Sequence, residues 1–273
     1  MMTCLNMPEK CRSYAAIMKA LLLRDLFVLR TKLLDLVINS TIVLGVEMII
    51  WLYLYPAFGV DYRVSLPLFF GFPLLSLLLN LGFGFSMKYT FGAAYQGYGD
   101  LEYHLTLPLP SICVFTAYVL SFWIESFLVT VPLIAGALLF LHSMGGVYNG
   151  SLALFFIFYA IVVFLIGFIF VAASFHYPFA WFKANMWPRR IGPLIVVGAT
   201  FYPWYRVYAY SPHLAYVMLL NPVTYICEGL RAALFGSNGS SLPVAGCLLI
   251  VITVLCLSFV WMKQSVKKRL DLI

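Results

Sequence analysis

The sequence has very little charge. Only 10% of its 273 residues are Asp, Glu, Lys or Arg, whereas 63% are hydrophobic and the mean hydropathy is +0.97. A soluble domain of this length needs far more charge to cover its surface. The composition therefore excludes an ordinary soluble globular protein and indicates an all-α integral membrane protein.

Motifs for nucleotide binding and for common hydrolytic chemistry are also absent. The chain has no G-x-x-x-x-G-K-[ST] segment, whose backbone amides and lysine would hold nucleotide phosphates. It lacks H-E-x-x-H and G-x-S-x-G, the commonest signatures of metallohydrolases and serine hydrolases. We therefore expect no catalytic site and no cofactor bound by this chain itself.

Histidine and cysteine form no metal-binding pattern. The four histidines fall in four different expected loops or helix ends, and no two of the six cysteines make a C-x-x-C. A metal site needs several such ligands close together. We expect no metal site, and we interpret the cysteines as small apolar side chains or unpaired thiols.

Apolar stretches of about 20 residues, the length that crosses a bilayer, recur along the chain. Five are clear, and a sixth is apolar but ends in the aromatic run FYPWYRVYAY. The sequence thus predicts six transmembrane helices. They are Leu36–Tyr55, Val64–Ser86, a window within Cys113–Leu141, Leu152–Ser174, Ile191–Ala209 and Pro243–Met262.

The positions of Lys and Arg predict the orientation. With six spans and both termini in the cytoplasm, all but three of the 17 Lys and Arg residues lie inside, the exceptions being Arg63, Arg206 and Arg231. Such cytoplasmic enrichment orients membrane helices. A seventh span over residues 211–236 would place the basic tail outside. We therefore expect this segment to be a re-entrant helical hairpin between spans five and six, covered by protein or water. The basic excess then reflects orientation and predicts no binding of nucleic acid.

The N-terminal residues 12–22, RSYAAIMKALL, have an amphipathic pattern. Apolar side chains from Tyr14 to Leu21 share one helix face, and Arg12 and Lys19 fall on the other. A short helix of this kind suits the membrane interface, although an ordinary solvated helix is the alternative. We divide the chain into a cytoplasmic N-terminus with this interfacial helix (1–35), a transmembrane domain (36–262) and a basic cytoplasmic tail (263–273).

Residues 97–111, GYGDLEYHLTLPLPS, are a polar interruption between spans two and three. Asp100 can cap a helix, Leu101 and Leu105 share a face, and two prolines follow. The stretch predicts a short cytoplasmic helix at about 97–107. A plain connecting loop is the alternative, but a loop need not be capped or end so abruptly, so we favour a docking element.

Three features together resemble the ABC-2 family of exporter permeases. They are the amphipathic N-terminal helix, the segment GDLEYHLTLPLPSICVFTAYVLSF before and within span three, and the segment LLNPVTYICEGLRAALFG after span five. The last is similar to the family's asparagine–proline…glutamate–glycine–leucine–arginine signature and is the most specific. One departure is that Gln96, Gly97 and Tyr98 stand where the family often has an arginine–glutamate pair.

The resemblance implies a half-transporter of the bacterial cytoplasmic (inner) membrane. A second permease copy or a sister permease would complete it, together with two copies of an ABC ATPase subunit that binds ATP and Mg²⁺. Surrounded by membrane lipids, it would export a lipid-linked glycan, a lipid or an amphipathic drug. The residues that would couple it to the ATPase are Asp100, Leu101, Glu102, Tyr103, His104 and Leu105.

Three polar residues inside the expected spans are candidates for the translocation path: Glu47, Asn80 and Glu125. An ionised carboxylate at membrane depth costs several kcal/mol, and these spans contain no Lys or Arg to neutralise it. The side chains would therefore face a polar interior, contacting substrate or the paired subunit. The alternative is a hydrogen bond to a nearby Ser, Thr or Tyr that holds two helices together.

The hairpin has its own polar residues. Asn221 and Pro222 would form its break, and Glu228 and Arg231 are three apart, so they can pair on one helix face as a structural clamp.

Two other functions stay open at this point. A membrane-embedded transferase-type enzyme would need polar groups clustered at one membrane face, whereas the sequence has them scattered. A non-transporting membrane assembly factor for an ATPase would share the same topology.

Overall fold

The computed structural model describes residues 9–54, 57–58, 70–87, 110–143, 150–236 and 242–270. Within these ranges every regular element is a helix, as the composition predicts. Three helices are long and apolar enough to cross a membrane, and they correspond to the expected spans three, four and six. They are α7 (Ser111–Ser143), α8 (Leu152–His176) and α14 (Val244–Leu270).

The N-terminal part of the chain forms one long helix. Helix α1 (Glu9–Ile49) runs without a break and continues into the π-helical turn η1 (Ile50–Leu54). The prediction of a separate short interfacial helix is therefore wrong: residues 12–22 are the first turns of the helix that also contains most of span one. The physical reason is that no Gly or Pro occurs between Glu9 and Leu44 to end it.

The expected second span is described over residues 70–87. Its helix α4 (Phe72–Phe85) has 14 residues, or about 21 Å at 1.5 Å per residue. It packs against α8, α1 and α7.

The expected fifth span, Ile191–Ala209, is not one helix, so this prediction is wrong. The helical run starts earlier, as α9 (Phe179–Asn185), η3 (Met186–Ile191) and α10 (Gly192–Val197). The chain then turns, with Ala199 at a positive φ of 55°, before α11 (Trp204–Tyr210). Gly198 allows this turn to approach α13, because a Cβ at that position would lie 2.4 Å from Cγ1 of Val223.

Two helices follow where the broken hairpin is expected. Helix α12 (Pro212–Met218) ends at a tight turn, and α13 (Pro222–Phe235) is almost entirely buried. The start of α8 is fixed to the end of α13, because the amide of Gly150 donates to the carbonyl of Leu234.

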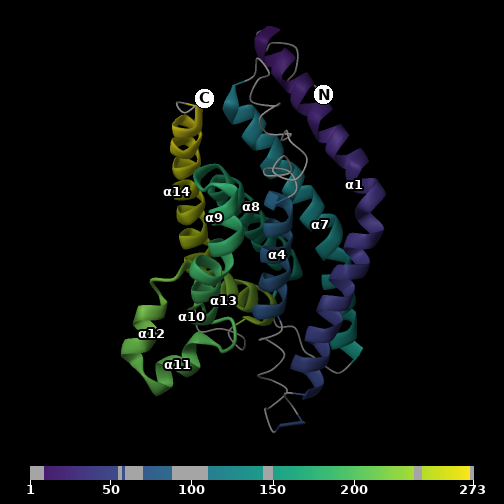
Figure 1. The fold of residues 1–273 in the computed structure, drawn as a ribbon. Helices are drawn as coiled ribbons and strands as arrows, with labels where there is room; N and C mark the ends of the chain where they lie inside the picture. Colours follow the sequence, from purple (N-terminus) through teal and green to yellow (C-terminus); the bar gives the residue numbers. More distant parts are fainter. Residues whose placement is uncertain are drawn as a thin grey trace.

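Helix α8 lies at the centre of the packing. Helix α14 packs along it, α13 packs against both, and α1 packs along α7 (Figure 1). The first turns of α1 and the last turns of α14 lie at the same end of the bundle, whereas α11 and α12 lie toward the other end (Figure 1). Aromatic rings fill much of the core, for example Phe70 edge-on to Phe155 with ring centroids 5.9 Å apart.

Candidate functional site

A polar pocket of about 350 Å³ lies between α1, α4 and α7. Two of the three intramembrane candidates, Asn80 of α4 and Glu125 of α7, both line it. The other polar residues in its lining come from α1 and are Lys32, Asp35 and Asn39.

Two of the α1 residues of this pocket were expected elsewhere. Lys32 and Asp35 belong to the segment that the sequence assigned to the cytoplasmic N-terminus. Because α1 is continuous, it carries both residues down to the level of Asn80 and Glu125. The spans that hold the three candidates contain no Lys or Arg, but Lys32, just before span one, lines the same pocket as Glu125. The seven-residue spacing of Asp25, Lys32 and Asn39, two helical turns each, is the signal that could have revealed this common face.

Asp25 extends the polar contact between α1 and α7. The hydroxyl of Ser121 donates to Oδ2 of Asp25 over 2.7 Å, and Arg24 pairs with Oδ1 over 2.8 Å. Asp25 and Glu125 also line a small recess between the two helices. The interface thus carries fixed carboxylates next to the pocket, and Asp25 is a residue that the sequence reasoning missed.

Glu47 lies apart from this pocket, 15 residues after Lys32 on the same helix, or about 22 Å along its axis. Its Oε2 accepts a 2.9 Å hydrogen bond from the indole of Trp51. Trp51 is itself buried and stacks on Phe201 with ring centroids 6.3 Å apart. The structure therefore gives Glu47 a partner one turn away on the same helical run, and it does not bring Glu47 together with the other two candidates.

Glu228 and Arg231 form a fully buried ion pair, as their spacing predicts. Oε1 of Glu228 lies 2.9 Å from Nη1 of Arg231, and both side chains have 0% exposure. Arg231 also donates to the carbonyls of Ala199 (2.7 Å) and Thr200 (2.9 Å), and Glu228 accepts from the amide of Trp204 (2.9 Å). Buried charges are tolerated only when such bonds satisfy them. The pair therefore holds the turn between α10 and α11, whose backbone groups would otherwise be unsatisfied.

Asn221 and Pro222 form the break between α12 and α13. Oδ1 of Asn221 caps α13 by accepting from the amide of Val223 over 3.0 Å, and Pro222 occupies the first helical position. The side-chain amide of Asn221 donates to the carbonyl of Leu194 over 2.7 Å. The break is thus tied to α10. Thr224, which the sequence reasoning did not select, adds a 2.8 Å hydrogen bond to a carbonyl at the end of α12.

The residues of the expected docking helix at 97–107 lie outside the described residues. In the part of the chain that the structure describes, no three His, Cys, Asp or Glu side chains gather where they could hold a metal ion.

No protein-family model matches the chain, and neither a curated protein sequence nor a solved structure matches it. The resemblance to ABC-2 permeases therefore rests on the sequence segments themselves.

Proposed function

We propose that this chain is the membrane permease subunit of an ATP-driven ABC-2 type exporter. The supporting observation is that each characteristic residue of the segment LLNPVTYICEGLRAALFG has a structural task in one compact element. Asn221 caps α13, Pro222 starts it, and Glu228 and Arg231 hold the neighbouring turn. Gly229 leaves room for Phe158, since a Cβ there would lie 2.2 Å from its Cζ. The positions of Asn221, Pro222, Glu228, Gly229 and Arg231 within the segment thus match the contacts that each residue makes.

In this proposal the bundle crosses the membrane six times. The passages are α1, α4, α7, α8, the run α9–η3–α10, and α14, and α11–α13 form the re-entrant element on the outer side. The common position of the first turns of α1 and the last turns of α14 supports an even number of passages, with both termini in the cytoplasm (Figure 1).

The polar pocket between α1 and α4 is the proposed start of the translocation path. Lys32, Asp35, Asn39 and Asn80 line it and are exposed on the single chain. Charged and polar side chains at membrane depth need a polar partner or a water-filled cavity. A second permease copy would enclose this face, and a lipid-linked glycan, a lipid or an amphipathic drug would pass between the two copies.

The motor would be a separate ATPase that binds ATP and Mg²⁺, because the chain has no phosphate-binding motif. To test this, the full-length chain is co-expressed with an ATPase subunit encoded beside its gene and purified by a tag on the permease. We expect the ATPase to co-purify, and we expect the double variant Leu101→Asp/Leu105→Asp to retain less than about a tenth of it. Charges on the docking face would remove the apolar contact.

A control with one Leu→Asp change in the expected cytoplasmic tail, Leu272→Asp, should retain the ATPase, and so should any other single Leu→Asp variant in the tail. Inside-out vesicles containing the complex should take up a candidate lipid or drug only with ATP. The proposal fails if no ATPase co-purifies and the vesicles accumulate none of these compounds.

A further inference from the structure

A second cavity, of about 290 Å³, lies between α4, α8, η3, α10, α13 and α14. It opens to the surface of the single chain, where its lining residues Arg190 and Leu194 are exposed. Its walls are apolar, with Leu75, Ile166, Val223 and Val254 coming from four different helices. Among the lining residues that the structure describes, Arg190 of η3 carries the only charge.

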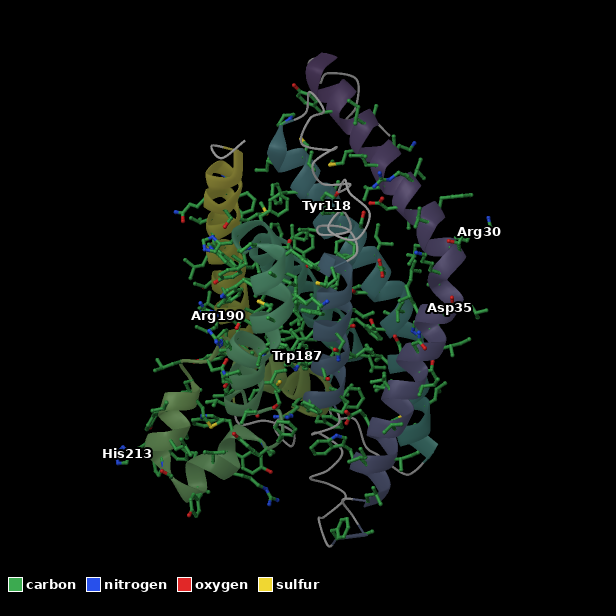
Figure 2. All side chains as sticks on the ribbon, viewed as in Figure 1. Arg30, Asp35, Tyr118, Trp187, Arg190 and His213 are labelled. Carbon is green, nitrogen blue, oxygen red and sulfur yellow. The ribbon has the colours of Figure 1, made fainter. Side chains whose placement is uncertain are left out.

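Arg190 does not lie near an end of the bundle. It follows 11 residues after the start of the helical run at Phe179, and the cavity that it lines extends from Leu165 in the middle of α8 to Tyr177, just past the end of that helix. Leu165 is 13 residues from the start of α8 and 11 from its end, or about 20 Å and 17 Å. The sequence reasoning placed Arg190 in the cytoplasm, just before a span that starts at residue 191. The helical run in fact begins at Phe179, which carries Arg190 down the bundle. Figure 2 shows it on the flank near α14.

A guanidinium at this depth needs a partner. The cavity lining contains no Asp or Glu, and among the described residues no side chain forms an ion pair or hydrogen bond with Arg190. The nearest acidic residue on α13, Glu228, is already paired with Arg231. An ionisable residue within a membrane usually marks the place where a ligand or substrate binds. An anionic group is the chemistry that would complete it.

The local backbone also presents Arg190 in an unusual way. It lies in a π-helical stretch, Met186–Ile191, that contains Pro188. Single π-helical turns inside α-helices are frequent at functional sites because the extra residue changes which side chains face inward. Here the stretch places Met186, Arg190 and Ile191 together in the lining of one cavity.

We propose that this cavity binds an acyl chain of an anionic membrane lipid, whose phosphate headgroup pairs with Arg190. A guanidinium forms two parallel hydrogen bonds with phosphate oxygens. In a zwitterionic lipid, the ammonium group of the headgroup competes with the guanidinium for the phosphate, so the pair with Arg190 is weaker. The volume is at the lower end of the roughly 300–1,000 Å³ of small-molecule sites, so it holds one apolar chain and leaves the headgroup outside. The role of this lipid site in transport rests on the proposed function. Lipid binding itself requires no ATPase.

Trp261 lines the cavity and serves as the probe. The full-length chain, purified without a partner, is titrated with phosphatidylglycerol or phosphatidylcholine whose acyl chains carry bromine, a quencher of tryptophan fluorescence. The signal of Trp261 is the difference between the natural chain and Trp261→Phe. We expect phosphatidylglycerol to quench it at about tenfold lower concentration than phosphatidylcholine, as one charge-assisted pair provides.

The matched variants are Arg190→Gln and Arg189→Gln. Both arginines are exposed on the single chain, but only Arg190 lines the cavity. Loss of Arg189 should therefore leave the preference unchanged, whereas Arg190→Gln should abolish it. Arg190→Lys should keep part of the lipid preference. If Arg190→Gln unfolds, Arg190→Lys takes its place and should show a smaller preference than the natural chain. A cavity-filling change, Val254→Phe, should weaken quenching by both lipids.

Equal quenching by the two lipids, or equal loss in the two arginine variants, would overturn the inference and leave the proposed function standing. Conversely, an intact lipid preference in a chain that neither co-purifies with an ATPase nor transports any candidate lipid or drug would exclude the exporter and leave the lipid site.

Discussion

The backbone of Gly71 lies directly against the guanidinium of Arg231. A Cβ atom at position 71 would be 2.2 Å from Nη2 of Arg231 and 3.0 Å from the carbonyl oxygen of Thr200. Gly71, which precedes α4, therefore packs directly against the buried ion pair and leaves no room for a side chain. This contact links the second helical passage to the hairpin, although about 160 residues separate the two along the chain.

Replacing Gly71 with Ala should destabilise the protein. The methyl group would push Arg231 away from its carbonyl partners, and overpacking of this kind costs about 1–3 kcal/mol. Thermal unfolding in detergent checks this prediction. Gly84→Ala on the same helix is the control, because nothing lies within 4 Å of a Cβ there. A similar loss in both variants would contradict it.

Removing one partner of the ion pair should be more damaging. Arg231→Leu leaves the buried carboxylate of Glu228 without its cation, and two carbonyls lose their donor. Breaking such a pair costs about 3–5 kcal/mol, so we expect little folded protein. The expression level and the unfolding midpoint are the measurements. Arg206→Gln, at an exposed position of α11, should have almost no effect.

Lys32 and Glu125 should be energetically coupled because they line one pocket. In a double-mutant cycle of Lys32→Met and Glu125→Gln, we expect an interaction of at least about 0.5 kcal/mol in the unfolding free energy. The same cycle for Lys32 and Glu47, about 22 Å apart along α1, should be additive. If the first cycle were additive too, the pocket would not bring the two charges into contact.

The proposed topology predicts which positions are reachable from outside the cell. In a chain without its native cysteines, Ser151→Cys and Tyr210→Cys should react with a membrane-impermeant maleimide added to whole cells. Gln264→Cys should react only after the membrane is opened, because α14 returns to the end where α1 starts (Figure 1). All three positions are exposed, so accessibility within the protein does not limit the reaction. Labelling of Gln264→Cys in intact cells would exclude six passages.

The sequence predicted those parts of the fold that depend on local properties. Helices α7, α8 and α14 follow from long apolar runs, and the break at Asn221 and Pro222 and the pairing of Glu228 with Arg231 follow from residue types and spacing within a few residues. Length, hydropathy and helical periodicity are enough for each of these.

Some features were not predicted because they depend on contacts between residues far apart in the sequence. Others were missed because one sequence pattern was given more weight than another. The amphipathic pattern of residues 12–22 suggested a separate short helix, although the absence of Gly and Pro favoured its continuation. The turn that divides the fifth span exists because Arg231, about 30 residues later, supplies donors to its carbonyls. The two cavities likewise combine residues from several helices, so no local pattern could reveal them.

The uninterrupted α1 has a mechanical consequence. With no flexible joint before Gly45, its 41 residues form a stiff rod about 61 Å long. Packing against α7 holds it, and so does the bond between Asp25, 16 residues after the start of the helix, and Ser121. A displacement of its first turns would therefore be carried along the rod to its other end, which continues into Trp51, stacked on Phe201 next to the turn that Arg231 holds.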